Sequence, residues 1–166
     1  MANEFDALKI TNGKFTPAEG TAMDLGCTGS LSGETTTKTV RKICEGVPVK
    51  ERTKPESMTL TFSGHLLVDA YRALFGFKED DALTGKWAYG TYSTNANGVF
   101  TWDVEGFDGE TKTMTFGNAT LASGYAFSIE NGVEEVAEVS LTITAMPDAT
   151  TGDIYGEEIT EPVVTP

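Results

Sequence analysis

Apolar and polar residues alternate along several stretches of this chain, and this alternation limits the fold more than any other feature. From Val139 to Ala145, every second residue is apolar and the residues between are serine or threonine. Successive side chains of a β-strand point to opposite faces, so such a run predicts a strand with one buried face. The same pattern recurs at residues 57–62, 100–105, 113–116 and 125–129.

The breaks between these runs have the composition of tight turns. Residues 95–98 are expected to join the run 87–92 to the run 99–105, and Asp108-Gly109 to join the latter to 112–116. Asn131-Gly132 precedes the last long strand. Asn-Gly and Asp-Gly accept the positive φ that hairpin turns need, so antiparallel pairing is predicted.

One segment has helical spacing instead. Between Gly64 and Gly76, apolar residues recur one, four and five positions apart, which predicts an amphipathic helix with Ser63 as its N-cap and Gly76 just past its end. Core packing explains this apolar face better than a membrane or a partner helix does. The predicted fold class is therefore mainly β, an antiparallel β-sandwich or barrel with one flanking α-helix.

The chain of 166 residues has the size of one domain. We place the β domain at residues 1–147, including a long basic segment at 33–56 that forms either a loop or an extended hairpin. Residues 148–166 are acidic, and we expect them to form a flexible or partner-ordered C-terminal tail.

Charge is distributed unevenly around a net value of −13. Residues 1–78 carry ten basic and nine acidic side chains, whereas residues 79–166 carry two basic and sixteen acidic ones. Neutralising nucleic-acid phosphates requires lysine and arginine, so this balance argues against DNA binding.

No motif for catalysis or metal binding stands out. The single histidine, His65, lies at the predicted start of the helix without a nucleophile motif, so a structural role is favoured. Cys27 and Cys44 are expected to be reduced and partly buried thiols, and two cysteines alone make no zinc site. The acidic stretch 103–110 lacks the spacing of a calcium loop. We therefore expect no enzymatic activity, no cofactor and no metal.

The sequence also indicates a compartment. The first residues have neither a basic region nor an apolar stretch, and no apolar run reaches the roughly 18 residues needed to span a bilayer. Synthesis in a cytoplasm, with no membrane partner, is expected.

The order of these segments resembles a known family over residues 1–155. An N-terminal strand leads to the basic segment, and the strand Met58–Phe62 leads into the predicted helix His65–Phe75. Trp87-Ala88-Tyr89-Gly90 opens the hairpins, and residues 128–132 lead into 134–148. In this order the chain is similar to the major tail (tail tube) proteins of long-tailed bacteriophages of Gram-positive bacteria.

This resemblance implies a self-assembling structural protein of the virion. In that family, six copies form a ring, and rings stack around a tape-measure protein into a hollow tail tube. Tail-tip and terminator proteins are further partners, and DNA passes through the lumen during ejection without specific binding. The protein would be found in the virion tail, and in the host cytoplasm during assembly.

Two sets of residues are assigned to this role as hypotheses. A channel lined with carboxylates repels phosphate, so the polar faces of the hairpins are candidates for the lumen. The candidate lumen-facing residues are Thr101, Asp103, Glu105, Glu138 and Thr142. The basic segment would contact an acidic surface of a neighbouring ring. Its candidate contact residues are Lys38, Arg41, Lys42, Lys50, Arg52 and Lys54.

Two alternatives remain open at this point. A β-sandwich that binds a small ligand or a carbohydrate could use an aromatic platform of Tyr89, Tyr92, Trp87 and Trp102, although alternation directs Trp102 inward. The chain could also be the tube subunit of a phage-derived bacteriocin or secretion machine.

Overall fold

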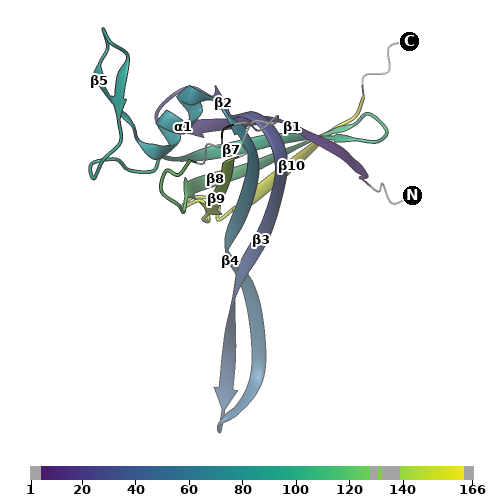
Figure 1. The fold of residues 1–166 in the computed structure, drawn as a ribbon. Coiled ribbons are helices and arrows are strands. Elements are labelled where there is room, and N and C mark those ends of the chain that lie inside the picture. Colours follow the sequence, from purple (N-terminus) through teal and green to yellow (C-terminus); the bar gives the residue numbers. More distant parts are fainter. Residues whose placement is uncertain (1–4, 128–130, 132–138, 163–166) are drawn as a thin grey trace.

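The structure is a computed structural model that describes residues 5–127, 131 and 139–162. Within these residues it contains many strands and a single short helix (Figure 1). In chain order the elements are β1 (Ala7–Pro17), β2 (Met23–Asp24), β3 (Gly26–Cys44), β4 (Val47–Leu66), α1 (Val68–Phe75), β5 (Lys78–Asp81), β6 (Lys86–Ala88), β7 (Asn97–Gly106), β8 (Thr111–Leu121), β9 (Val139–Ala145) and β10 (Tyr155–Thr160). None of the described helical residues forms a segment long and apolar enough to cross a membrane.

The main sheet is antiparallel throughout and has the strand order β2-β1-β7-β8-β9-β4-β3. One side of β8 pairs with β7. On its other side, the first half of β8 pairs with β10 and the end pairs with β9. The predicted fold class, an antiparallel β-sandwich with a flanking helix, is confirmed.

The core consists of the apolar faces that the alternation predicts. Along β7, Phe100, Trp102 and Val104 are buried while the residues between them are partly exposed. They pack against apolar side chains from β1, β4, β8, β9 and α1. The core members from those elements include Phe15, Leu60, Phe62, Leu74, Phe116, Leu141 and Ile143.

The helix starts later than the sequence predicts. Strand β4 continues to Leu66, so Ser63 and His65 are strand residues, and the N-cap is Leu67 without a side-chain hydrogen bond. Pairing of β4 with both β3 and β9 outweighs the local helical spacing. The predicted end is confirmed, because Gly76 adopts the left-handed conformation with φ 69°.

The predicted strand connections have different outcomes in the structure. The β7–β8 turn at Asp108-Gly109 is confirmed, with Gly109 at φ 87°. The predicted hairpin through residues 95–98 is wrong, because β6 pairs with β5 and not with β7. Residues 125–127 form no strand, and the rest of that predicted run, together with Gly132, lies outside the described residues.

The predicted C-terminal tail contains an ordered strand. Residues 155–160 form β10, and Glu158 lies opposite Thr113 of β8. A turn precedes it, in which the Asp148 carboxylate accepts hydrogen bonds from the backbone N–H groups of Thr150 and Thr151. The acidic composition concealed this strand, since Glu157 and Glu158 stand at consecutive positions on opposite faces of it.

The basic segment forms a long hairpin, the extended one of the two forms considered for it. Strands β3 and β4 project together from the sheet, and every residue from 32 to 56 is exposed (Figure 1). The turn is two residues long, with φ 51° at Glu45 and 81° at Gly46. Two successive positive φ values are the signature of a type I′ turn, which suits the twist of a hairpin.

Candidate functional site: a projecting hairpin and a polar sheet face

The register of the β3–β4 hairpin shows on which of its two faces each basic residue lies. Lys38 lies opposite Lys54, and Lys42 lies opposite Lys50. Residues directly opposite each other in an antiparallel pair project to the same side. Arg52 lies opposite Val40 and joins the same set. Five of the six predicted contact residues therefore share one face, which we call the basic face: Lys38, Lys42, Lys50, Arg52 and Lys54.

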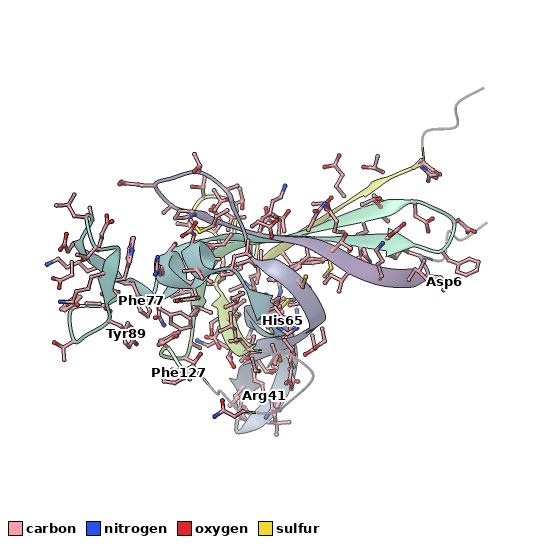
Figure 2. All side chains as sticks on the ribbon, turned by 45° about the horizontal axis from the view of Figure 1, so that its top comes forward. Asp6, Arg41, His65, Phe77, Tyr89 and Phe127 are labelled. Atoms are coloured by element: carbon pink, nitrogen blue, oxygen red, sulfur yellow. The ribbon has the colours of Figure 1, made fainter. Side chains whose placement is uncertain are left out.

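Arg41 does not belong to this set. Its cross-strand partner is Glu51, and its Nε donates to Glu51 Oε2 at 2.7 Å. Arg41 is labelled on the projecting hairpin in Figure 2. Because this charge is already paired on the opposite face, it contributes less to attracting an acidic partner.

The basic face is electrostatically unfavourable for the isolated chain. Like charges directly opposite on neighbouring strands destabilise a sheet, and this face has two such pairs. Within the part of the chain that the structure describes, no acidic side chain forms an ion pair with these five residues. An acidic surface brought against this face would relieve the repulsion.

The end of the hairpin is apolar, a feature that sequence reasoning missed. Four aliphatic side chains are more than half exposed there, and we call them the hairpin tip: Val40 (58%), Ile43 (63%), Val47 (61%) and Val49 (53%). The sequence shows these aliphatic residues between the lysines, but only the turn at Glu45-Gly46 brings them together at one end of the hairpin.

The candidate lumen residues lie on the polar face of the main sheet. Thr101, Asp103 and Glu105 alternate with the buried residues of β7, and Thr142 alternates with those of β9. Strand β8 separates these two strands. Glu138, the fifth candidate, lies outside the described residues. Threonines of β4, β8 and β9 share this polar face, since Thr59 lies opposite Thr144 and Thr120 does as well.

Both acids of β7 have partners on this face. The Glu105 carboxylate lies 2.8 Å from Lys9 Nζ. Asp103 accepts hydrogen bonds from Asn12 Nδ2 at 2.9 Å and from Thr113 Oγ1 at 2.8 Å. This part of the face is consequently polar and threonine-rich, with its negative charge partly compensated.

A cavity of about 510 Å³ opens at the base of the hairpin. It lies where β1, β7, β8 and β10 face the start of the β3–β4 hairpin, and its walls are mainly apolar. We call it the base cavity, and the side chains that define it are Leu8, Ile10, Leu31, Met58, Val104 and Met114. Leu8 is 60% exposed at its mouth.

Acidic groups stand beside the base cavity. Tyr155, which lines it, donates its hydroxyl hydrogen to Glu157 Oε2 at 2.6 Å. This hydrogen bond, reinforced by Lys112, lowers the pKa of Glu157, while burial and the carboxylate raise the pKa of Tyr155. Asp153 lines a neighbouring hollow that shares Met58 and Tyr155 with the base cavity.

The proposed aromatic platform is not assembled as the sequence suggested. Trp102 is fully buried in the core, and the Arg72 guanidinium covers the ring of Trp87 at 4.7 Å. Tyr89 instead stacks on Phe77, with ring centroids 5.1 Å apart. These two rings lie together at the end of the molecule that carries the β5–β6 hairpin (Figure 2).

Of the remaining candidate residues, Cys27 and His65 lie directly opposite each other on β3 and β4, whereas Cys44 lies at the far end of the hairpin. Cys27 and Cys44 are free and exposed, so the expectation that they are partly buried is wrong. Both lie on β3, at its base and at its tip, too far apart for a disulfide within one chain. His65 lies in β4, where its Nδ1 is buried without a hydrogen bond within the described structure. Among the described residues, no three His, Cys, Asp or Glu side chains gather to hold a metal ion.

Comparison with solved structures shows a similarity of fold. The fold is similar to that of a chain in the cryo-EM structure of the anti-feeding prophage cap, the cap that terminates the tube of that particle. The TM-score is 0.52 and the sequences are 12% identical, over 96% of this chain and 95% of that chain. At this identity the similarity shows a shared fold. No protein-family model and no curated protein sequence matches the chain.

Proposed function

We propose that this protein is a structural subunit of a phage-tail-related tube, in which copies of the chain form stacked hexameric rings. The observation that carries this proposal is the projecting β3–β4 hairpin, whose residues 32–56 are all exposed. A monomer gains little from the projecting part of this hairpin, because residues 32–56 contribute no side chain to the core. Extended elements of this kind are useful when a second molecule covers them.

Charge supports contact between copies. The basic face of the hairpin needs an acidic partner, and the segment after residue 78 of the same chain carries sixteen acidic side chains against two basic ones. Complementary charge speeds association and fixes the register of the contact. A second copy of the chain therefore offers the surface that the hairpin requires.

The polar sheet face supports a role as channel lining. Threonine and serine hydroxyls cover β4 and β9 there, and the acids of β7 add negative charge. Such a surface has few cations with which to hold DNA phosphates, so DNA would pass through without binding. The proposed lumen residues remain Thr101, Asp103, Glu105, Glu138 and Thr142.

The similarity to a tube-terminating cap is consistent with two structural roles for this chain, as a tube subunit and as a cap. A tube subunit must bind a copy of itself on both faces of its ring, whereas a cap ends the tube and binds on one face. The same comparison favours a structural over an enzymatic role, and a phage-derived particle over a free small-molecule binder.

Imaging the assembled protein tests the proposal. Concentrated protein is examined by negative-stain electron microscopy while its mass in solution is measured by analytical ultracentrifugation. Hollow tubes of stacked rings are expected for a tube subunit, and single or paired rings for a cap. A strict monomer at all concentrations, also in the presence of tape-measure and tail-tip proteins, would overturn the proposal.

A variant isolates the part played by the hairpin. Replacing Lys38, Lys42, Lys50, Arg52 and Lys54 with glutamine removes the basic face while leaving the core unchanged. Stacking should be lost while the circular dichroism spectrum and melting temperature stay close to those of the parent. Tubes of normal length from this variant would contradict a role for the basic face.

A second candidate function follows from the base cavity. Its volume lies within the roughly 300–1,000 Å³ typical of small-ligand pockets, and its walls are apolar, which fits an apolar ligand better than a carbohydrate. A thermal-shift screen with fatty acids and with sugars separates the two functions, since a tube subunit should respond to neither.

A further inference from the structure

We propose that the hairpin tip of one copy docks into the base cavity of a second copy. This inference rests on the proposed function and identifies the contact by which each copy would hold the next. The donor surface is the set Val40, Ile43, Val47 and Val49, and the acceptor is the cavity edged by Leu8 and Ile10.

The hairpin tip is apolar on both of its faces. Val40 and Val47 project to the basic face, because they lie opposite Arg52 and Cys44. Ile43 projects to the opposite face with Arg41, and Val49 is the extra residue at the irregular step between Lys42 and Ile43. A flat surface would cover only one of these faces, whereas a cavity covers both. Burial of this exposed apolar surface favours docking.

The base cavity offers matching walls. Its side chains are mainly aliphatic or methionine, and the single charged residue among those that line it, Lys9, is paired with Glu105 at 2.8 Å. A volume of about 510 Å³ accommodates several aliphatic side chains. Methionines at two of its walls, Met58 and Met114, adapt to irregular shapes.

Charge favours a second copy of this chain as the occupant. When the tip enters the cavity, the lysines that follow it along the hairpin come close to the residues around the cavity mouth. Glu157 lies two residues beyond Tyr155 on the same face of β10, and Asp153 lines the adjoining hollow, whose rim also includes Arg52 and Lys54 of the acceptor. The acids of the acceptor therefore stand where the basic face of the donor arrives.

The same hairpin separates donor from acceptor, so the contact cannot close within one chain. Gly33 lines the cavity and Cys44 precedes the turn, eleven residues further along an extended strand. At about 3.4 Å per residue, this distance is roughly 37 Å. The contact is head-to-tail, and such contacts either close into rings or propagate. The axial repeat of the assembly should not exceed that length.

Two single variants test each side of the contact. Ile43→Asp places a charge on the hairpin tip, and Leu8→Asp places one at the cavity mouth. Both positions are mostly exposed, at 63% and 60%, so the monomer should fold. Leu83→Asp is the matched control, since Leu83 is 98% exposed and lies in the β5–β6 loop. Each test variant should reduce sedimentable assembly at least tenfold, and the control should not.

Mixing the two defective variants tests the direction of the contact. Ile43→Asp keeps an intact cavity and Leu8→Asp keeps an intact tip, so an equal mixture contains one functional contact. Two-layer particles are expected, with no long tubes. If either variant alone still forms tubes as the parent does, the proposal is overturned.

Cross-linking locates the contact directly. Cys44 already stands beside the turn, so Leu8→Cys in a Cys27→Ser background should give covalent ladders with a short thiol–thiol cross-linker. Leu83→Cys in the same background should not. If tubes form and depend on the basic face while Leu8→Cys gives no ladder and Leu8→Asp has no effect, this inference fails and the proposed function stands. If the parent chain never assembles, both fail.

Discussion

The indole Nε1 of Trp102 donates a hydrogen bond to Oγ1 of Thr28 at 3.2 Å, and this bond joins the centre of the sheet to the base of the projecting hairpin. Trp102 lies in β7 and Thr28 in β3, which are far apart in the strand order of the sheet. The tryptophan ring is fully buried and stacks on Phe100 with centroids 5.8 Å apart. A hydrogen bond from the core thus helps to hold the base of the hairpin in place.

Thr28→Val should reduce stability through this bond. Valine has nearly the shape of threonine but cannot accept a hydrogen bond, so the buried indole N–H loses its partner. We expect a loss of about 1–3 kcal/mol in the free energy of unfolding, measured by urea denaturation. The control is Thr39→Val, which removes an exposed contact with Thr53 and should change stability by less than about 0.5 kcal/mol. Equal losses in both variants would contradict the role of the bond.

Gly64 should tolerate no side chain, because β4 approaches β3 closely at this position. A Cβ atom there would overlap the carbonyl oxygen of Cys27 and crowd the ring of Phe62. Gly64→Ala should destabilise the protein by about 1–3 kcal/mol, as overpacking does. At Gly117 a Cβ would meet no atom within 4 Å, so Gly117→Ala is a matched control. Thermal unfolding should show a lower melting temperature for the first variant and an unchanged or slightly higher one for the second.

The core was predictable because the apolar residues of each alternating run are the residues that the fold buries. The face of β7 with Phe100 and Trp102, and that of β9 with Leu141 and Ile143, follow directly from period two. Strand pairing was less predictable, because it depends on partners distant in the chain. Strand β6 pairs with β5, and β4 extends through His65, since hydrogen-bonding neighbours decide these boundaries.

The candidate site was predictable in composition but not in geometry. Six basic residues between positions 38 and 54 are evident from the sequence, yet only the register reveals that Arg41 faces away from the other five. The base cavity could not be predicted, because its walls come from six strands that meet only in the folded chain. Leu8 and Met58 carry no local signal that they share a surface.

The turn before β10 should weaken in acid. The backbone N–H groups of Thr151 and Thr150 hold the pKa of Asp148 below its ordinary value of 3.8. A lowered pKa in the folded state means that this contribution is complete above pH 3.8 and is lost as the pH falls below that value. Asp148→Asn, whose side chain does not titrate, should be less stable than the parent near neutral pH.

The measurement is the free energy of unfolding of both proteins as a function of pH. The difference between them should shrink as the pH falls below 3.8. All other carboxyl groups titrate in both proteins, so their effects cancel in this difference. A gap that stays constant down to the acid limit would show that the Asp148 charge does not stabilise the turn.

Lys42→Glu should affect the monomer and the assembly in opposite directions. Lys42 lies directly opposite Lys50, so the substitution converts a repulsive cross-strand pair into an attractive one. The hairpin of the monomer should gain about 0.2–1 kcal/mol. Assembly should weaken, because the basic face loses positive charge where the proposed acidic partner would contact it. An exchanged pair, Arg41→Glu with Glu51→Arg, is the control, since it preserves both the net charge and the ion pair on the opposite face.

The readout is the assembled fraction at increasing salt concentration. Salt screens exposed charges over about 10 Å at 0.1 M, so the parent assemblies should dissociate as salt is added. Lys42→Glu should already be dissociated at low salt, and the exchanged pair should follow the parent curve. If Lys42→Glu assembles like the parent at every salt concentration, the basic face has no role between copies. The hairpin would then be held by its apolar tip alone, because burial of aliphatic side chains is not screened by salt.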